Sequence, residues 1–384
     1  MTIIFGPGVS LGAGVQALGP DPTNLWAWGL NTNGQLGLGD TINRSSPVQV
    51  GSLGTWSQVS AGLRLTSAVK TDGTLWAWGL GQDGCLGQGN TTSYSSPKQV
   101  GELNTWAVTS SGDPAIGAIK TTGTLWTWGR NGYGQLGQGG TIYRSSPVQV
   151  GLLDTWSKIA AGVGAMAAIK TDGTLWTWGN NYIGQLGLGD KINRSSPVQV
   201  GILNDWSTIS AGTHYSSTTG AFIAGKTNGT LWSWGANNGA ALGVGQAQSR
   251  SSPTQIGSLT TWGVGTIGDQ FGFAIQTTGS LWTWGTAYSG DQADNRTLIQ
   301  GWVSGGIQVG LLTDWWSASN RAVAGGRTGL AIKSDGTLWN WGNNANGALG
   351  KNDTANTSSP VQLGLLNTWL SVSAVDSVLA IAGH

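Results

Sequence analysis

The pentapeptide LWAWG at residues 25–29 decides the fold, because its pattern returns throughout the chain. Copies of Leu-Trp-x-Trp-Gly begin at Leu25, Leu75, Leu125, Leu175, Leu231, Leu281 and Leu338. Their spacings are 50, 50, 50, 56, 50 and 57 residues. Large and small side chains alternate within each copy, as is typical of a β-strand. Seven copies at a nearly constant period indicate a repeat architecture.

Each repeat predicts four short strands when the sequence is followed outward from the pentapeptide. The first copy continues through RSSPVQVG (44–51) and TWSQVSAG (55–62) to SAVKTDG (67–73). Asp-Gly at 72–73, 172–173 and 335–336 and Asn-Gly at 228–229 stand between two such segments, where hairpin turns use them. Seven units of four strands are typical of a β-propeller. A linear stack of repeats is the alternative, but it needs polar capping units, and the sequence offers none.

The two ends of the chain predict how the ring closes. The first copy, at Leu25, lacks the two strands that precede the pentapeptide elsewhere. The last residues, LSVSAVDSVLAIAGH (370–384), match those two strands. We therefore expect an all-β, seven-bladed propeller of four-stranded blades over residues 24–384, closed by pairing of its N- and C-terminal strands, with a short N-terminal extension over 1–23.

The composition excludes several classes of protein. The chain holds 66 glycines and 23 tryptophans, while Glu102 is its only glutamate, which argues against a mainly helical fold. Its formal net charge is +1 with no basic run, so we expect no nucleic-acid partner. No apolar stretch is long enough to span a membrane. Cys85 is the only cysteine, so neither a disulfide framework nor a cysteine-based zinc site is expected. We predict no cofactor and no metal.

The tryptophans predict the packing between blades. Three per repeat account for 21 of the 23. We expect them to pack between neighbouring blades, beginning with Trp26, Trp28, Trp56, Trp76, Trp78 and Trp106. The alternative is a set of aromatic platforms for sugars. Trp302 and Trp316 fall outside the repeat and are the better surface candidates; since Trp316 follows Trp315, strand alternation should turn one of the pair outward.

A series of arginines precedes Ser-Ser-Pro in four repeats: Arg44, Arg144, Arg194 and Arg250. We expect each guanidinium to bind the carbonyls of its own Gly-rich loop, with help from Asp40 or Asp190 four residues earlier. A ligand-binding ring of arginines is the alternative.

The motif WGLNTNGQLGLGD (28–40), repeated as WGNNYIGQLGLGD (178–190) and followed by Arg-x-x-Pro-Val-Gln-Val, resembles the regulator of chromosome condensation repeat family. The resemblance covers about residues 24–384 and implies a seven-bladed propeller. The Trp-rich variant Lys-Thr-Asp-Gly-Thr-Leu-Trp is similar to the bacterial and bacteriophage branch of the family.

The resemblance does not imply the activity of the family's eukaryotic founder, which is nucleotide exchange on a small GTPase and docking on nucleosomes. Family members carry a histidine three residues after the Ala-Gly glycine, and the corresponding residues here are Leu65, Ala165 and Tyr215. What the resemblance implies instead is protein binding by the loop-bearing face.

Residues for catalysis are scarce. Only His214 and His384 could act as imidazole bases, and Asp291 and Asp294 form the only close pair of carboxylates outside the repeat pattern. We predict that the protein is not an enzyme. The competing hypothesis is an enzyme with a site in the central channel.

Departures from the repeat predict a recognition surface. Residues 211–226 carry six extra residues, 286–306 carry three, and 317–329 carry four. We assign all three insertions to loops on one face, and we expect a recognition face there that includes Tyr215, Trp302, Trp316, Arg321 and Arg327. The alternative is that these are tolerated loop variants.

Residues 1–23 have no place in the repeat and carry apolar side chains at Ile3, Ile4, Phe5, Val9, Leu11 and Val15. A Gly-rich apolar start of this kind resembles those of some tailed-phage virion proteins. We therefore expect a non-enzymatic bacteriophage virion structural protein, a capsid decoration or a tail- or fibre-associated propeller. Its arm would bind other virion proteins or copies of itself, and its ring would bind a host surface receptor or glycan. The alternative is a bacterial extracellular propeller that acts as an inhibitor or adhesin.

Overall fold

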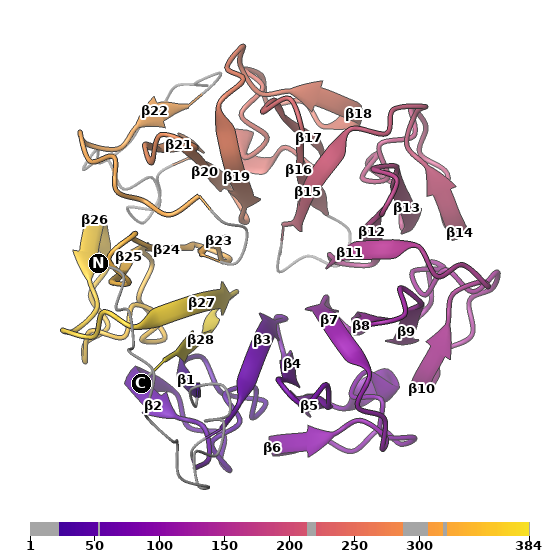
Figure 1. Cartoon of the computed structure of the whole chain (residues 1–384), viewed down its shortest axis with the longest axis horizontal. Coiled ribbons are helices and arrows are strands. Elements are labelled where there is room, and N and C mark those ends of the chain that lie inside the picture. Colours follow the sequence, from indigo (N-terminus) through magenta and orange to yellow (C-terminus); the bar gives the residue numbers. More distant parts are fainter. Residues whose placement is uncertain (1–22, 53, 213–219, 287–305, 318–320, 384) are drawn as a thin grey trace, which may run out of the picture.

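The computed structural model describes residues 23–52, 54–212, 220–286, 306–317 and 321–383. These residues form seven four-stranded antiparallel sheets arranged as blades around a central channel (Figure 1). The seven-bladed propeller predicted from the repeat is confirmed. Neighbouring strands are antiparallel in every sheet, including β28 and β1, which belong to opposite ends of the chain.

The blades are numbered here from the one that contains both chain ends. Blade 1 holds β27 (Trp369–Ala374), β28 (Ser377–Ala382), β1 (Asn24–Gly29) and β2 (Arg44–Gln49); blade 2 holds β3 (Trp56–Ala61), β4 (Leu65–Lys70), β5 (Leu75–Gly79) and β6 (Tyr94–Gln99); blade 3 holds β7 (Trp106–Ser111), β8 (Ala115–Lys120), β9 (Leu125–Gly129) and β10 (Arg144–Gln149); blade 4 holds β11 (Trp156–Ala161), β12 (Ala165–Lys170), β13 (Leu175–Gly179) and β14 (Arg194–Gln199).

Blade 5 holds β15 (Trp206–Ala211), β16 (Ala221–Lys226), β17 (Leu231–Gly235) and β18 (Arg250–Gln255); blade 6 holds β19 (Trp262–Ile267), β20 (Phe271–Gln276), β21 (Leu281–Gly285) and β22 (Ile307–Gln308); blade 7 holds β23 (Ala322–Ala324), β24 (Thr328–Ile332), β25 (Leu338–Gly342) and β26 (Thr357–Gln362). Two short 3₁₀ turns, η1 (Gln82–Gly84) and η2 (Asn238–Ala240), lie in the Gly-rich loops of blades 2 and 5.

Pairing between the two chain ends closes the ring, as the sequence predicted. β1 pairs with β28 in unbroken antiparallel register, from Asn24 opposite Ala382 to Gly29 opposite Ser377. The sheet order β2-β1-β28-β27 makes blade 1 from both ends of the chain, with two strands from each. Blade 1 therefore has the same four strands as its neighbours.

The second tryptophan of the pentapeptide is buried between blades. It is at most 1 % exposed in all seven copies, Trp28, Trp78, Trp128, Trp178, Trp234, Trp284 and Trp341. The Trp78 indole donates a hydrogen bond at 2.9 Å to the Gln35 carbonyl of the preceding blade, and Trp178 does the same to Gln135. Burying an indole removes about 150–250 Å² from water, which is worth up to about 4–6 kcal/mol.

In five of the seven blades, the other two tryptophans of the repeat form an indole pair that holds a lysine: Lys70, Lys120, Lys170, Lys226 or Lys333. In blade 2, the Trp56 ring lies edge-on to Trp76, with centroids 6.2 Å apart, and Trp26 takes the position of Trp76 in blade 1. The Lys70 ammonium lies 4.4 Å from the Trp76 centroid and 4.9 Å from that of Trp56. Trp106 and Trp126 hold Lys120 in the same way. We call this unit the indole clamp.

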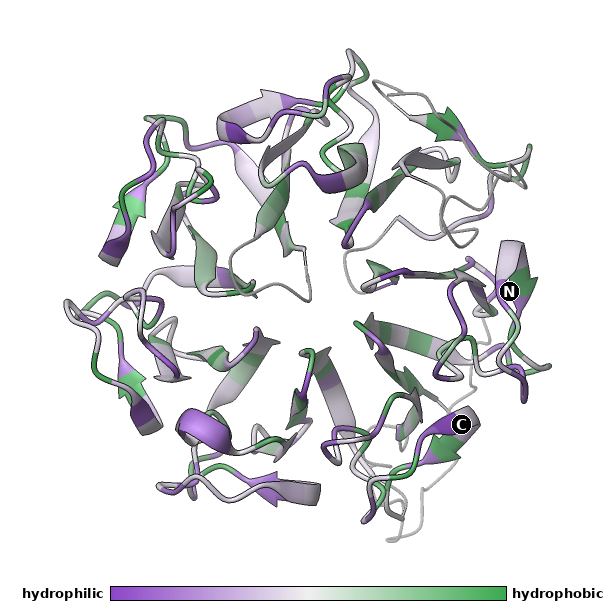
Figure 2. Cartoon of the chain, turned by 180° about the vertical axis from the view of Figure 1, so that it is seen from behind, coloured by the Kyte–Doolittle hydropathy of each residue, from purple (hydrophilic) through white to green (hydrophobic). Residues whose placement is uncertain are grey.

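The two sides of the ring carry different connections. The turn after β4 and the connector to the next blade lie on one side, because the Trp106 N–H donates to the Gly73 carbonyl at 3.0 Å. Gly73 has a φ of +80°, and a Cβ there would lie 2.1 Å from the Asn104 carbonyl, so the Asp-Gly turn requires glycine. We call this the connector side. The Gly-rich loops lie on the loop side, seen in Figure 2, where hydrophobic and hydrophilic residues interleave around the ring.

Hydroxyl groups join the innermost strands around the channel. Ser373 accepts a hydrogen bond from the Ala61 N–H at 2.8 Å, and Ser60 accepts one from the Ser111 N–H at 2.8 Å. Thr266 bonds the Ala324 N–H in the same way. These bonds satisfy backbone groups where the innermost strands converge.

Blade 7 corrects one expectation from the sequence. We predicted its four extra residues in the loop between its first two strands, but that connection is the ordinary short one, from Ala324 to Thr328. The Trp316 N–H donates to the Ile332 carbonyl at 3.0 Å, and the Ile332 N–H donates to the Arg321 carbonyl at 2.8 Å. The extra residues therefore lie in the sequence between Trp316 and Arg321, before β23 begins, and not in the loop that follows it. The Ala-Gly pair that ends this strand in blades 2, 4 and 5 sits at 324–325 in blade 7 and already marked that position.

Candidate functional site

The predicted recognition residues do not gather on one face. Tyr215 and Trp302 lie outside the described residues, as do the predicted arm residues Ile3, Ile4, Phe5, Val9, Leu11 and Val15. Of the rest, Arg321 precedes β23 and Arg327 follows it, so the two arginines lie at opposite ends of this strand. Arg321 is on the connector side, and Arg327 is on the loop side.

Trp316 and Arg321 stack on each other. The guanidinium carbon lies 3.7 Å from the Trp316 ring centroid, and Nη1 donates to the Trp369 carbonyl of blade 1 at 3.0 Å. Partial burial lowers the pKa of Arg321. Trp316 is 37 % exposed while Trp315 is 3 % exposed, as strand alternation predicted. The pair joins blade 7 to blade 1 and leaves one edge of the indole in solvent.

Arg327 extends over the loop between the first two strands of blade 6. Its Nε lies 3.6 Å from a carboxylate oxygen of Asp269, whose side chain is only 2 % exposed. Arg64 of blade 2 and Asp113 of blade 3 make a similar bridge at 3.0 Å. These ion pairs link neighbouring blades at the channel mouth on the loop side.

The arginines before Ser-Ser-Pro bind their own loops. Arg44 Nη1 donates to the Ile42 carbonyl at 2.7 Å, and Nη2 lies 2.5 Å from the Asp40 carboxylate. Arg194 repeats both contacts with Ile192 and Asp190. Arg144 differs, because residue 140 is glycine and its Nε instead donates to the Gln138 amide oxygen at 3.3 Å.

The central channel is narrow. A cavity of about 140 Å³ lies at the end of the innermost strands, lined mainly by serine, threonine and alanine. The hydroxyls of Ser60 and Ser110 in its wall accept hydrogen bonds from backbone N–H groups of the next blade. The lining residues that the structure describes there include no acid or base for catalysis. His214 and Asp291, which the enzyme hypothesis needs, lie outside the described residues.

The connector side carries a ring of exposed aliphatic side chains. Each connector starts with a glycine in the left-handed region, such as Gly151 at φ +62°, and the next residue points into solvent. At four of the seven connectors that residue is aliphatic and 92–96 % exposed: Leu152, Ile202, Leu311 and Leu365. We call these four side chains the aliphatic ring.

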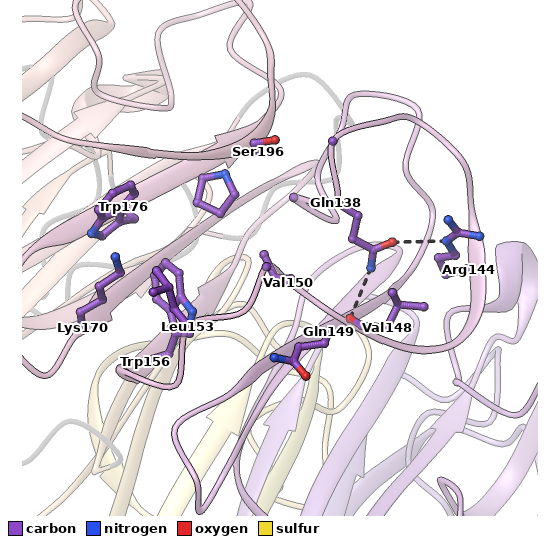
Figure 3. Close-up of a pocket in the computed structure, with 14 residues that line it drawn as sticks. Gln138, Arg144, Val148, Gln149, Val150, Leu153, Trp156, Lys170, Trp176 and Ser196 are labelled. Carbon is purple, nitrogen blue, oxygen red and sulfur yellow. Dashed lines mark hydrogen bonds between the residues drawn. The ribbon is translucent and has the colours of Figure 1, made fainter.

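A groove of about 480 Å³ lies between blades 3 and 4 (Figure 3). Val150 and Leu153 form its wall from the end of β10 and the connector, while Trp156, Trp176 and Pro197 form its wall from blade 4. Figure 3 shows Lys170 beside Trp176 at one end of the groove and Arg144 at the other, with Gln138 and Val150 between them. The volume lies in the range of ordinary ligand sites.

The ammonium of Lys170 is held in an indole clamp. It lies 3.8 Å from the Trp176 ring centroid and 5.0 Å from that of Trp156, and the residue is only 8 % exposed. Burial lowers the pKa of Lys170, and the charge of Asp172 opposes this shift. The faces of the two indoles stabilise the charged form electrostatically.

The equivalent groove between blades 7 and 1 carries no clamped lysine. It has a volume of about 200 Å³ and is lined by Trp26, Pro47, Leu363, Leu366 and Trp369 among others. The lysine position of the repeat is Ala382 there. Both grooves therefore have an indole wall, but only the one between blades 3 and 4 has a cation against that wall.

The sequence reasoning missed the groove between blades 3 and 4. Its signal was present in the repeat, because Gly140 stands where blades 1, 4 and 7 carry aspartate, and Thr155 stands where blades 5 and 7 do. Within the described part of the chain, no group of three or more metal-ligating side chains converges. None of the described helices is long and apolar enough to cross a membrane.

The fold and the repeat together define a seven-bladed propeller of tryptophan-rich blades. A protein-family sequence model described as regulator of chromosome condensation (RCC1) repeat matches residues 24–69, 72–113, 122–169, 172–218, 228–275 and 335–378. A second family model of that description matches residues 156–185. The chain belongs to the RCC1 repeat family. The unmatched span between 275 and 335 contains the irregular parts of blades 6 and 7.

Solved structures share the fold at low sequence identity. Human WBSCR16 is 20 % identical over 94 % of this chain and 99 % of that chain, with a TM-score of 0.80. Prp20p from Saccharomyces cerevisiae, described with its binding properties to Gsp1p and histones, is 17 % identical over 95 % and 92 %, with a TM-score of 0.80. Yeast RCC1 (Prp20) bound to Kap60 is 16 % identical over 100 % and 96 %, with a TM-score of 0.79. No curated protein matches the chain.

Proposed function

We propose that this chain is a non-enzymatic binding protein that docks on a protein surface through the connector side of its ring. The observation that carries the proposal is the aliphatic ring. Leu152, Ile202, Leu311 and Leu365 are each more than nine-tenths exposed at equivalent connectors, where they contribute little to the core. Apolar side chains gathered on one side of a protein mark interaction surfaces.

The narrower form of the proposal is a bacteriophage virion structural protein, attached to neighbouring virion proteins or copies of itself by residues 1–23. Two features of the sequence support it: the Trp-rich variant of the repeat, and the apolar, Gly-rich composition of residues 1–23. A host surface receptor or glycan is the partner proposed for the exposed ring. The formal net charge of +1 does not favour a nucleic acid as partner.

The incorporation of this protein into purified bacteriophage particles tests the proposal. Three proteins are compared: the full chain, a chain without residues 1–22, and a chain with Leu152, Ile202, Leu311 and Leu365 each replaced by serine. We expect the full chain in particles and the other two absent or strongly depleted. Since the four side chains are exposed, their replacement should leave the urea unfolding midpoint nearly unchanged.

A full chain that is absent from particles would contradict the virion proposal. If that chain instead bound a secreted or surface protein through the aliphatic ring, the alternative of a bacterial extracellular inhibitor or adhesin would replace it. If both variants behaved as the full chain in every binding assay, docking through the connector side would be wrong.

A further inference from the structure

The blades differ in whether a carboxylate pairs with the clamped lysine, so they can be compared with one another. In blade 5, Lys226 pairs with Asp205 at 3.2 Å, and in blade 7 Lys333 pairs with Asp314 at 3.2 Å. The aspartate in each pair directly precedes a tryptophan of the same clamp, Trp206 or Trp315. In blade 4 this position is Thr155, so Lys170 has no such partner.

The remaining carboxylate near Lys170 is already engaged. Asp172 accepts hydrogen bonds from the N–H and the hydroxyl of Thr174, at 2.9 and 2.7 Å. It acts on Lys170 only as a nearby charge. A buried ammonium without a paired anion is costly, because the low-dielectric surroundings replace only part of its hydration.

The same comparison applies to the arginine at the other end of the groove. Arg44 and Arg194 each bind an aspartate four residues earlier, at 2.5 Å, whereas that position before Arg144 is Gly140. The guanidinium of Arg144 donates through Nε to Gln138, and it forms no ion pair with a carboxylate of the described residues.

Among the described grooves, the one between blades 3 and 4 has both a clamped lysine and an arginine that lack a paired aspartate. Lys70 and Lys120 also have a threonine in place of the paired aspartate. However, the groove beside Lys70 adjoins the compensated Arg44, and the groove beside Lys120 adjoins Tyr94 in place of an arginine. Two unpaired cations therefore flank one apolar groove.

We propose that this groove binds an acidic peptide segment of a protein partner. One carboxylate of the segment pairs with Lys170, a second accepts paired hydrogen bonds from Arg144, and an aliphatic side chain between them packs on Trp176 and Leu153. The charges match, and an arginine fork suits a carboxylate. That the ligand is part of a protein rests on the proposed function, and it agrees with the position of Leu153 next to Leu152 of the aliphatic ring.

Fluorescence anisotropy of labelled peptides tests this proposal on the full chain. The probes carry two glutamates separated by a leucine-containing spacer of varied length, and a matched set carries glutamine in place of glutamate. We expect saturable binding of at least one acidic probe. Its glutamine analogue should bind at least about tenfold more weakly. Raising the salt concentration should weaken binding, since the contacts are ionic.

Variants that add charge rather than remove it provide the sharpest control. Thr155→Asp and Gly140→Asp supply the carboxylates that other blades carry, and a Cβ at Gly140 meets no atom within 4 Å. We expect each to weaken binding several-fold and the double variant to lose it, while the unfolding midpoint stays the same or rises. Lys170→Gln and Arg144→Gln should weaken binding about tenfold, whereas Lys226→Gln, at a compensated cation, should not.

Three outcomes would overturn the proposal: no acidic probe binds, Lys226→Gln weakens binding as much as Lys170→Gln, or glutarate alone competes as well as the peptides. The last would assign the groove to small dicarboxylates. Failure of the proposed function is separate, because it is read from particle incorporation by chains with an intact groove.

Discussion

Two buried side chains of opposite charge, one cation and one carboxylate, lack ion-pair partners that some other blades supply at the same positions. Lys170 lies in the groove between blades 3 and 4, and Asp376 lies between β27 and β28 on the loop side. Each is 8 % exposed. Burial lowers the pKa of Lys170 and raises the pKa of Asp376 to about 6, because in both cases it disfavours the charged form.

The comparison shows how differently the fold treats the two charges. Lys170 has two indole faces within 5.0 Å of its ammonium, whose electrostatic attraction offsets part of the desolvation. At the position of Asp376, blades 2 and 7 carry Arg64 and Arg327, each paired with an aspartate of the preceding or following blade. One carboxylate oxygen of Asp376 is buried without a hydrogen bond. The indoles of the clamp therefore offset part of the desolvation cost of the unpaired cation. The desolvation cost of the unpaired carboxylate is relieved mainly when the group is protonated.

The largest effect is expected from removing a wall of the clamp. Trp176→Ala should lower the free energy of unfolding by about 3 kcal/mol, the lower end for buried tryptophan, since this indole is half-buried. Trp232→Ala is the matched control in blade 5, where Asp205 still compensates Lys226. We expect the blade 4 variant to lose about 0.5–1 kcal/mol more. Urea unfolding measures both, and equal losses would show that the clamp does not replace the ion pair.

Asp376→Asn tests the other half of the comparison. The folded state holds the proton of Asp376 more tightly than the unfolded chain, so this group reduces stability as the pH rises from about 4 to about 6. The variant should therefore be more stable at pH 7 by roughly 1–3 kcal/mol, and the gain should disappear near pH 4. Urea unfolding at both pH values provides the check. A variant that is less stable at pH 7 would show that the carboxylate has a partner worth more than its desolvation.

Thr155→Asp restores an ion pair to Lys170. By analogy with Asp205, which is 34 % exposed in its side chain, we expect a gain of about 0.5–1 kcal/mol at pH 7. The gain should vanish once the new carboxyl is protonated at acid pH. Thr155→Asn, with similar shape and no charge, is the control, and equal stability of the two variants at pH 7 would contradict an electrostatic cause.

Gly140→Asp should have the smallest effect. The new carboxylate would lie four residues before Arg144 on the surface, so we expect a gain of about 0.2–0.5 kcal/mol at low ionic strength. High salt should remove the gain. Thermal unfolding at low and high salt is the measurement, and a gain that persisted in high salt would point to a backbone effect of replacing glycine.

The fold could be predicted from the sequence because the same local sequence signals recur from blade to blade. The pentapeptide places one indole between blades, the Asp-Gly turn requires the left-handed glycine, and the two half-units at 24–51 and 369–382 can be completed only by each other. Each of these signals is local, and seven copies leave one arrangement that satisfies them all.

The candidate site was much less predictable. The groove depends on two positions without a carboxylate, Gly140 and Thr155, although threonine is the commoner residue at the second position. Their importance appears only once Arg144 and Lys170 are seen to flank one cavity. The predicted recognition face combined Arg321 with Arg327 because the extra residues of blade 7 were assigned to a loop. They precede β23 instead, so that Arg321 and Arg327 lie at opposite ends of this strand.

The titration of the Lys170 side chain tests most directly whether this groove holds an uncompensated cation. NMR of the chain with ¹³C-labelled lysine, assigned with Lys170→Met, follows the ε-carbon through the alkaline range in the wild-type protein and in Thr155→Asp. We predict a midpoint below that of free lysine in the wild type, shifted upward in the variant. A wild-type midpoint at or above the free value would contradict the account, because it would mean that a carboxylate already compensates Lys170.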